Sequence, residues 1–196
     1  MTTVVVVRKR GVACIAADSL TTFGEQKLPP QYDRASDKIQ PVGDGAISIV
    51  GSAAHAPVLD SVLRERRVRL DLRDRQSIFE SFRALHAELK EHYFLNPKED
   101  EGDKDPYESS RIDALIANPA GIFGVYALRE VYDYQRFWAA GSGAEYALGA
   151  MYAAWDRVDD AEEIARIGVA AGAEFDTGSA LPLTLQSFAL AQPGAA

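Results

Sequence analysis

Apolar and polar positions at the start of the chain follow the pattern of β-strands. A β-branched run covers 3–7 and a second apolar run covers 12–17, with a polar turn between them that ends at Gly11. Val, Ile and Thr favour strands, and two such runs around a short polar turn are typical of a β-hairpin. Shorter apolar runs at 38–42 and 46–50 predict two further strands.

The period of the pattern changes after residue 52. Apolar residues recur at helical spacing across 53–70 and 77–94, which predicts two consecutive helices. Strand-like runs then return, followed by two more helical segments and a last strand. The expected strands are 112–117, 122–128, 131–138 and 183–190, and the expected helices are 144–155 and 161–172.

The order of these elements indicates the fold class. Helices come in consecutive pairs, whereas a doubly wound parallel sheet alternates single helices with strands. We therefore expect an α+β fold, a four-layer αββα sandwich in which two antiparallel sheets lie between two helix layers. A length of 196 residues suits one domain spanning 1–196, with 190–196 expected to be a disordered tail.

Composition and charge narrow the classes of function. A net charge of −8, without a basic stripe, argues against a nucleic-acid surface. No window is long and apolar enough to span a membrane, and the first residues do not resemble a signal peptide, so we expect a soluble, cytoplasmic protein. The single cysteine, Cys14, and three dispersed histidines form no metal-ligand pattern, and we expect neither a metal nor a cofactor.

The strongest candidate for chemistry is the start of the chain. No phosphate-binding glycine loop opens a helix, and no serine lies in a nucleophile-elbow motif. Met1 is normally removed when the next residue is small, which would leave a free α-amine and a hydroxyl together on Thr2. An α-amine titrates near ~7.7–8.0, so it can act as a base for its own hydroxyl. A Met-Thr start alone, however, is most often only the beginning of a strand.

Several blocks of sequence carry a resemblance to a known family. The segments 2–7 and 15–19 resemble the opening of proteasome β-subunits and of the peptidase ring of the bacterial heat-shock ATP-dependent protease. Further matching blocks follow in the family's order, at 38–39, 49–54, 140–143 and 175–179. Together they cover nearly the whole chain, which is most similar to the betaproteobacterial proteasome homologues.

The resemblance implies a fold and a set of roles. It implies the N-terminal-nucleophile hydrolase fold, with Thr2 attacking a peptide carbonyl at a cleft between the sheets. Asp18 is expected to pair with Lys38, whose charge favours the alkoxide of the nucleophile. The amide of Gly51 is expected to stabilise the oxyanion. Three further residues are expected to surround the threonine amine: Ser142, Asp176 and Ser179.

Several assignments stay open at this point. The segment 24–38 is longer than the family pattern, so Lys27 competes with Lys38 for the role of catalytic lysine, although a Lys-Ile pair at a strand start favours Lys38. Asp18 could simply end a strand, and Ser142, Asp176 and Ser179 could cap helices or form turns. Four residues are expected to line the substrate pocket: Thr21, Thr22, Ile49 and Ala53.

The function implied by the resemblance is a threonine-type endopeptidase in homo-oligomeric stacked rings. Its substrates would be peptides or unfolded proteins, and a separate ATPase unfoldase is implied as a partner. A retained Met1 would cover the amine, so a catalytically silent ring scaffold is one alternative. The other is an N-terminal-nucleophile amidase acting on small molecules, against which the Gly-Ser-Gly and Asp-x-x-Ser blocks argue.

Overall fold

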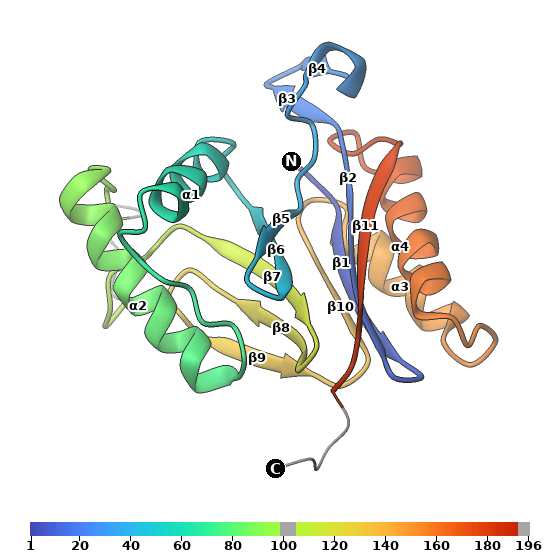
Figure 1. The fold of residues 1–196 in the computed structure, drawn as a ribbon. Helices are drawn as coiled ribbons and strands as arrows, with labels where there is room; N and C mark the ends of the chain where they lie inside the picture. Colours follow the sequence, from blue (N-terminus) through green and yellow to red (C-terminus); the bar gives the residue numbers. More distant parts are fainter. Residues whose placement is uncertain (99–104, 192–196) are drawn as a thin grey trace.

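The computed structural model describes residues 1–98 and 105–191, and it forms a sandwich of two antiparallel sheets between two helix pairs (Figure 1). One sheet has four strands in the order β10-β1-β2-β11, and the other has five in the order β5-β6-β7-β8-β9. A two-stranded sheet, β3-β4, projects at the top of the view. The fold class expected from the sequence is confirmed.

The structure defines the element bounds as follows. The strands of the four-stranded sheet are β1 (Val4–Lys9), β2 (Val12–Asp18), β10 (Phe137–Ala140) and β11 (Leu183–Ala189). Those of the five-stranded sheet are β5 (Gln40–Val42), β6 (Gly45–Val50), β7 (Asp113–Asn118), β8 (Gly121–Val125) and β9 (Val131–Tyr134). The small sheet contains β3 (Thr21–Phe23) and β4 (Gln26–Leu28), followed by a short 3₁₀ helix (Pro30–Tyr32). The α-helices are α1 (His55–Arg64), α2 (Arg75–His92), α3 (Ala144–Ala154) and α4 (Ala161–Phe175).

The first strand illustrates why the sheets stack. Side chains alternate between the two faces of a strand. Val4 and Val6 pack into the layer between the two sheets, whereas Val5 and Val7 pack toward α3 and α4. All four are 0% exposed, because both faces of β1 are covered. A continuous apolar run is the sequence expected for a strand in this position.

Apolar side chains form one core in each gap between layers. The outer cores lie under α1 and α2 and under α3 and α4, and the middle core lies between the sheets (Figure 1). Polar side chains fix the helix starts at Asp74 and Asp160, which accept from the amides of Ser77 at 2.8 Å and Glu162 at 2.9 Å. These caps satisfy amide groups that a helix leaves unpaired at its start. None of the described helices is long and apolar enough to cross a membrane.

The structure corrects two expectations about the elements and adds one element that was not expected. The expected strand at 131–138 is two strands in different sheets, joined by a turn at which Arg8 N donates to Arg136 O at 2.6 Å. The expected helix at 53–70 ends at Arg64, and Arg66 adopts a left-handed φ of 53° that a helix cannot continue through. The β3-β4 hairpin was not expected.

The chain end is described only in part. Leu190 N donates to Gly11 O at 2.8 Å, and Ala191 N donates to Pro119 O at 2.8 Å, so the chain continues along the sandwich after β11. The remainder of the expected tail, 192–196, lies outside the described residues.

Candidate active site

Antiparallel pairing places the beginning of the chain beside the ends of two other strands. Thr2 lies just before β1, Asp18 is the last residue of β2, and Ser142 follows β10. The first residue of β1 pairs with Ala17 on one side and with Ala140 on the other. Since neighbouring antiparallel strands run in opposite directions, these three polar residues meet at one end of the four-stranded sheet. The N-terminus in Figure 1 marks this end.

The hydroxyl of Thr2 contacts a buried ion pair. Thr2 Oγ1 donates to Asp18 Oδ1 at 2.7 Å. Lys38 Nζ donates to Thr2 Oγ1 at 2.9 Å and to Asp18 Oδ1 at 2.8 Å. The side chain of Asp18 is 0% exposed and that of Lys38 is 16% exposed. The three groups therefore form a compact triangle that is largely shielded from solvent.

Asp18 is held by the backbone as well as by side chains. The amides of Thr3, Leu20 and Ala180 donate to its carboxylate at 2.9, 3.0 and 3.1 Å. With Thr2 and Lys38, five donors surround the two oxygens. A carboxylate whose lone pairs are occupied in this way is held in place and fixes the position of the lysine.

A second set of hydrogen bonds surrounds the nitrogen of Thr2. Thr2 N donates to Ser142 Oγ at 3.2 Å, and Ser142 Oγ donates to Asp176 Oδ2 at 2.7 Å. Ser179 Oγ donates to the same carboxylate oxygen at 2.7 Å. The six residues expected to form the polar part of the site are thus brought together. We call them the N-terminal cluster: Thr2, Asp18, Lys38, Ser142, Asp176 and Ser179.

The environment shifts the pKa of two charged groups in the N-terminal cluster. Burial lowers the pKa of Lys38 from its ordinary value of 10.5, and the neighbouring Asp18 carboxylate opposes but does not cancel this effect. Partial burial works against the ionised form of Asp176. Hydrogen bonds from Ser142 and Ser179 outweigh it and hold the pKa of this carboxyl below its ordinary value.

Glycines allow the close packing of the chain start. Gly141 has a left-handed φ of 98°, and a Cβ at this position would lie 2.1 Å from the carbonyl oxygen of Thr2. A Cβ on Gly178 would lie 2.2 Å from Cβ of Met1. Thr2 itself is only 5% exposed. Both glycines are therefore required by close contacts with the first two residues.

The remaining predicted residues lie outside these hydrogen bonds. Gly51 directly follows β6 with a φ of 121°, is exposed, and makes no hydrogen bond to the N-terminal cluster within the described part of the chain. Thr21 and Thr22 are half-buried on β3, Ile49 is half-buried on β6, and Ala53 is exposed before α1. The structure does not connect these four to the cluster by any hydrogen bond among the described residues.

The competing lysine lies elsewhere. Lys27 is exposed on β4 and is paired through its backbone with Thr22 in the projecting hairpin. Lys38, just before β5, is the lysine whose ammonium reaches Thr2 and Asp18. The geometry therefore favours Lys38.

Sequence reasoning missed three members of the site. The side chain of Thr3 and the amides of Leu20 and Ala180 contact the N-terminal cluster. Thr3 could have been considered because it adjoins Thr2, but its place in the β-branched run 3–7 indicated only a strand. The two amides carry no signal in the sequence, because any residue type supplies one.

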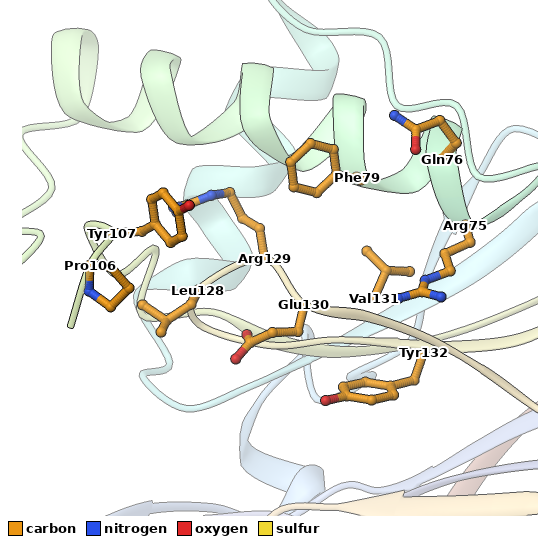
Figure 2. A pocket seen from close by; sticks show the side chains of 10 residues that line it. All are labelled: Arg75, Gln76, Phe79, Pro106, Tyr107, Leu128, Arg129, Glu130, Val131 and Tyr132. Carbon is orange, nitrogen blue, oxygen red and sulfur yellow. The ribbon is translucent and has the colours of Figure 1, made fainter.

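A hollow of about 750 Å³ lies away from the N-terminal cluster. Figure 2 shows it between α2 and the turn from β8 to β9, with Phe79, Tyr107 and Tyr132 among its side chains. We call it the α2–β9 pocket. None of the predicted site residues lines it.

Other nucleophile and metal sites find no support in the described residues. Cys14 is fully buried, and burial raises the pKa of its thiol to about 12, so the reactive thiolate is suppressed. Among residues 1–98 and 105–191, no group of three or more His, Cys, Asp or Glu side chains could hold a metal ion.

The arrangement defines a class of protein. Two antiparallel sheets between helix pairs, with a threonine at the beginning of the chain inside a polar cluster, are the features of the N-terminal-nucleophile hydrolase fold.

Comparisons with known proteins agree with this class. Two solved structures of Thiobacillus denitrificans BPH, one of them in complex with epoxomicin, match with a TM-score of 0.89 and 44% identity. They cover 97% and 98% of this chain and 100% of their own. HslV from Trypanosoma brucei matches in fold, with a TM-score of 0.67, 21% identity, 96% of this chain and 99% of its own covered. No family model and no curated protein matches the chain.

At this identity and coverage, the chain belongs to the family of proteasome β-subunits and HslV, as a homologue of the betaproteobacterial type represented by BPH. Membership of this family supports the assignment of the chain as a proteasome-type peptidase subunit.

Proposed function

We propose that this protein is a threonine-type endopeptidase in which Thr2 becomes the nucleophile once Met1 is removed. One observation carries the proposal. The Thr2 hydroxyl lies within hydrogen-bonding distance of both Asp18 and Lys38, while the nitrogen of the same residue is 3.2 Å from Ser142 Oγ. The Thr2 hydroxyl, the Lys38 ammonium and the Thr2 nitrogen that becomes an amine therefore lie in one site.

The base in this mechanism is the freed amine of Thr2. In a chain that keeps Met1, this nitrogen belongs to a peptide bond and cannot accept a proton. Asp18 accepts hydrogen bonds from five donors, and we assign it the role of holding Lys38 in place. Removal of Met1 converts the nitrogen into an amine, with Ser142 and Asp176 placed to orient it.

The reaction then proceeds in two halves. The amine takes the proton of the Thr2 hydroxyl, and the oxygen attacks the substrate carbonyl while the Lys38 ammonium stabilises its developing negative charge. The amide of Gly51 is proposed to stabilise the tetrahedral oxyanion. The protonated amine gives its proton to the departing peptide nitrogen, leaving an ester on Thr2, and water hydrolyses this ester in the second half.

The four residues expected to contact substrate complete the proposal. Thr21, Thr22, Ile49 and Ala53 are proposed to line the pocket for the residue before the cleaved bond. Their small or medium-sized side chains favour a small-to-medium apolar residue there.

We further propose that the chain forms one domain that assembles in the cytoplasm into homo-oligomeric stacked rings with the N-terminal clusters facing inward. Peptides or unfolded proteins would be the substrates, supplied by a separate ATPase unfoldase. Membership of the proteasome and HslV family supports this assembly. Mass photometry tests it, since particles many times the 21.3 kDa chain mass are expected and monomers at micromolar concentration contradict it.

Covalent labelling tests the nucleophile. Epoxomicin, present in one BPH complex, is an epoxyketone with two electrophilic carbons, so a residue carrying a hydroxyl and a free amine can attack both. We expect the trimmed chain to gain the mass of one inhibitor, and Thr2→Ala to gain none. Thr177→Ala is the matched control, because this threonine is exposed and its side chain makes no hydrogen bond among the described residues.

The contrary outcomes separate the alternatives. A chain that keeps Met1, stays unlabelled and still forms large particles would indicate a catalytically silent ring scaffold. A labelled chain that stays monomeric or dimeric and hydrolyses only small amides would indicate an amidase.

A further inference from the structure

Thr3 belongs to both hydrogen-bonded halves of the site. Its backbone N–H donates to Asp18 Oδ1 at 2.9 Å, the oxygen that also accepts from Thr2 Oγ1. Its own hydroxyl oxygen lies 2.8 Å from Ser179 Oγ. Thr3 is 0% exposed, so solvent does not reach either bond.

The number of available hydrogens fixes the direction of the bond between Thr3 and Ser179. Ser179 Oγ donates to Asp176 Oδ2 at 2.7 Å, and the ionised carboxylate can only accept. A serine hydroxyl carries a single hydrogen, which this bond already uses. In the pair with Thr3, Ser179 must therefore accept, and Thr3 Oγ1 is the donor.

Two glycines enclose the hydroxyl of Thr3. A Cβ on Gly143, at the start of α3, would lie 2.0 Å from Thr3 Oγ1, and a Cβ on Gly172, within α4, would lie 2.3 Å from it. The same Cβ on Gly172 would lie 2.5 Å from the methyl carbon of Thr3. The start of α3 and the middle of α4 thus pack closely against this side chain.

We propose that Thr3 is a positioning residue whose hydroxyl acts through Ser179 and Asp176 to keep the freed Thr2 amine unprotonated. The inference rests on the proposed role of Thr2 as nucleophile. A donor to Ser179 polarises that hydroxyl and strengthens its bond to Asp176. A carboxylate whose charge is better shared with its donors attracts a proton on the neighbouring amine less strongly.

The charged groups around this amine come from three parts of the fold. Asp176 follows α4 and is linked to the Thr2 nitrogen through the hydroxyl of Ser142. Asp18 ends β2 and Lys38 precedes β5, and these two form their own ion pair. Because that ion pair is net neutral, Asp176 is the charged group through which the Thr3 hydroxyl can change the pKa of the Thr2 amine.

The rate of epoxyketone labelling as a function of pH tests the inference. Intact mass would follow labelling of the trimmed wild-type protein, Thr3→Val and Thr3→Ser between pH 5.5 and 9. Thr3→Val keeps the shape but loses the donor, so we expect the acid limb of its rate profile to move up by about 0.5 pH unit. Labelling near pH 6 then falls about threefold, whereas at pH 9 it stays within twofold. Thr3→Ser keeps the hydroxyl and should keep the wild-type limb.

A double-mutant cycle separates this route from a general structural effect. If Thr3 acts through Ser179, then Thr3→Val should shift the limb no further in a Ser179→Ala background. Thr3→Ala removes the same hydroxyl without adding an atom, and it replaces Thr3→Val if that variant does not fold. An unmoved limb, an equal movement in Thr3→Ser, or additive shifts in the double variant each overturn the inference.

The wild-type protein distinguishes the two levels of failure. If it takes no label at any pH, the proposed nucleophile is wrong. If it is labelled while the Thr3 variants keep its acid limb, only the role of Thr3 is wrong.

Discussion

The N-terminal cluster and the α2–β9 pocket are opposite kinds of site. The cluster contains a buried ion pair and draws its residues from strand ends and from the segments that follow α4 and β10. The pocket is open and lined partly by exposed aromatic side chains such as Tyr107 at 69% and Tyr132 at 50%. We therefore place the proposed chemistry where polar groups converge, and not at the open pocket.

The largest effect that tests this contrast is expected from changing Asp18, which lies in the buried ion pair. In Asp18→Asn the buried Lys38 ammonium loses its counter-charge, and a donor NH₂ is placed among amides that themselves donate. Removing one partner of a buried ion pair costs about 3–5 kcal/mol, so we expect a loss of that size in the free energy of unfolding. Urea unfolding measures it. A loss below about 1 kcal/mol would show that the pair is effectively solvated.

A smaller effect, on the rate of epoxyketone labelling, is expected from replacing Lys38. Lys38→Met removes the cation 2.9 Å from Thr2 Oγ1 and should slow epoxyketone labelling by about 10²-fold. Lys27→Met is the matched control on the projecting hairpin, and its labelling rate should stay within about twofold of wild type. Equal slowing in both variants would reopen the choice between the lysines.

The labelling rate at high pH tests the role of the Lys38 charge. Burial lowers the pKa of Lys38 below 10.5, so its charge, and with it the labelling rate, should fall with rising pH before that value is reached. Stability moves in the opposite direction. Between the lowered pKa and 10.5 the unfolded chain binds more protons than the folded one, so the contribution of Lys38 to the free energy of unfolding rises with pH. Labelling that stays flat through pH 10.5 would contradict this.

The smallest effect is expected in the α2–β9 pocket. Phe79 is 38% exposed, so Phe79→Ala removes only part of an apolar contact and should cost about 1 kcal/mol or less. The labelling rate should match that of wild type, because no member of the N-terminal cluster lines the pocket. A tenfold slower rate would mean that the two sites are coupled.

The fold could be predicted largely because its signals are local. The continuous apolar run Val4–Val7 identifies a strand that is covered on both faces, and the helical spacing of Ile78, Phe82 and Leu85 identifies a helix with one buried face. The turn between β9 and β10 escaped detection because strand-like residues continue on both sides of it. The change of sheet at Arg136 is a long-range property, fixed by its bond to Arg8.

The candidate site could be predicted from the sequence only in part. The resemblance indicated Thr2, Asp18 and Lys38, and the structure places them in mutual contact. The donors from Leu20 and Ala180 could not be predicted, since backbone amides leave no mark on residue identity. The contact between Thr3 and Ser179 spans 176 positions, a distance at which neither residue's type specifies the other.

The burial of Thr2 affects when the proposed removal of Met1 is easiest. The partner of its nitrogen, Ser142, lies 140 residues later in the sequence, so the site cannot close until that residue has been made. At roughly 5–20 residues per second, synthesis of that stretch takes about 7–30 s. During this interval the Met1–Thr2 bond is accessible to a processing enzyme. In the folded chain Met1 packs on Gly178 but stays 56% exposed, whereas Thr2 is only 5% exposed, so we expect trimming to be faster before folding than after it.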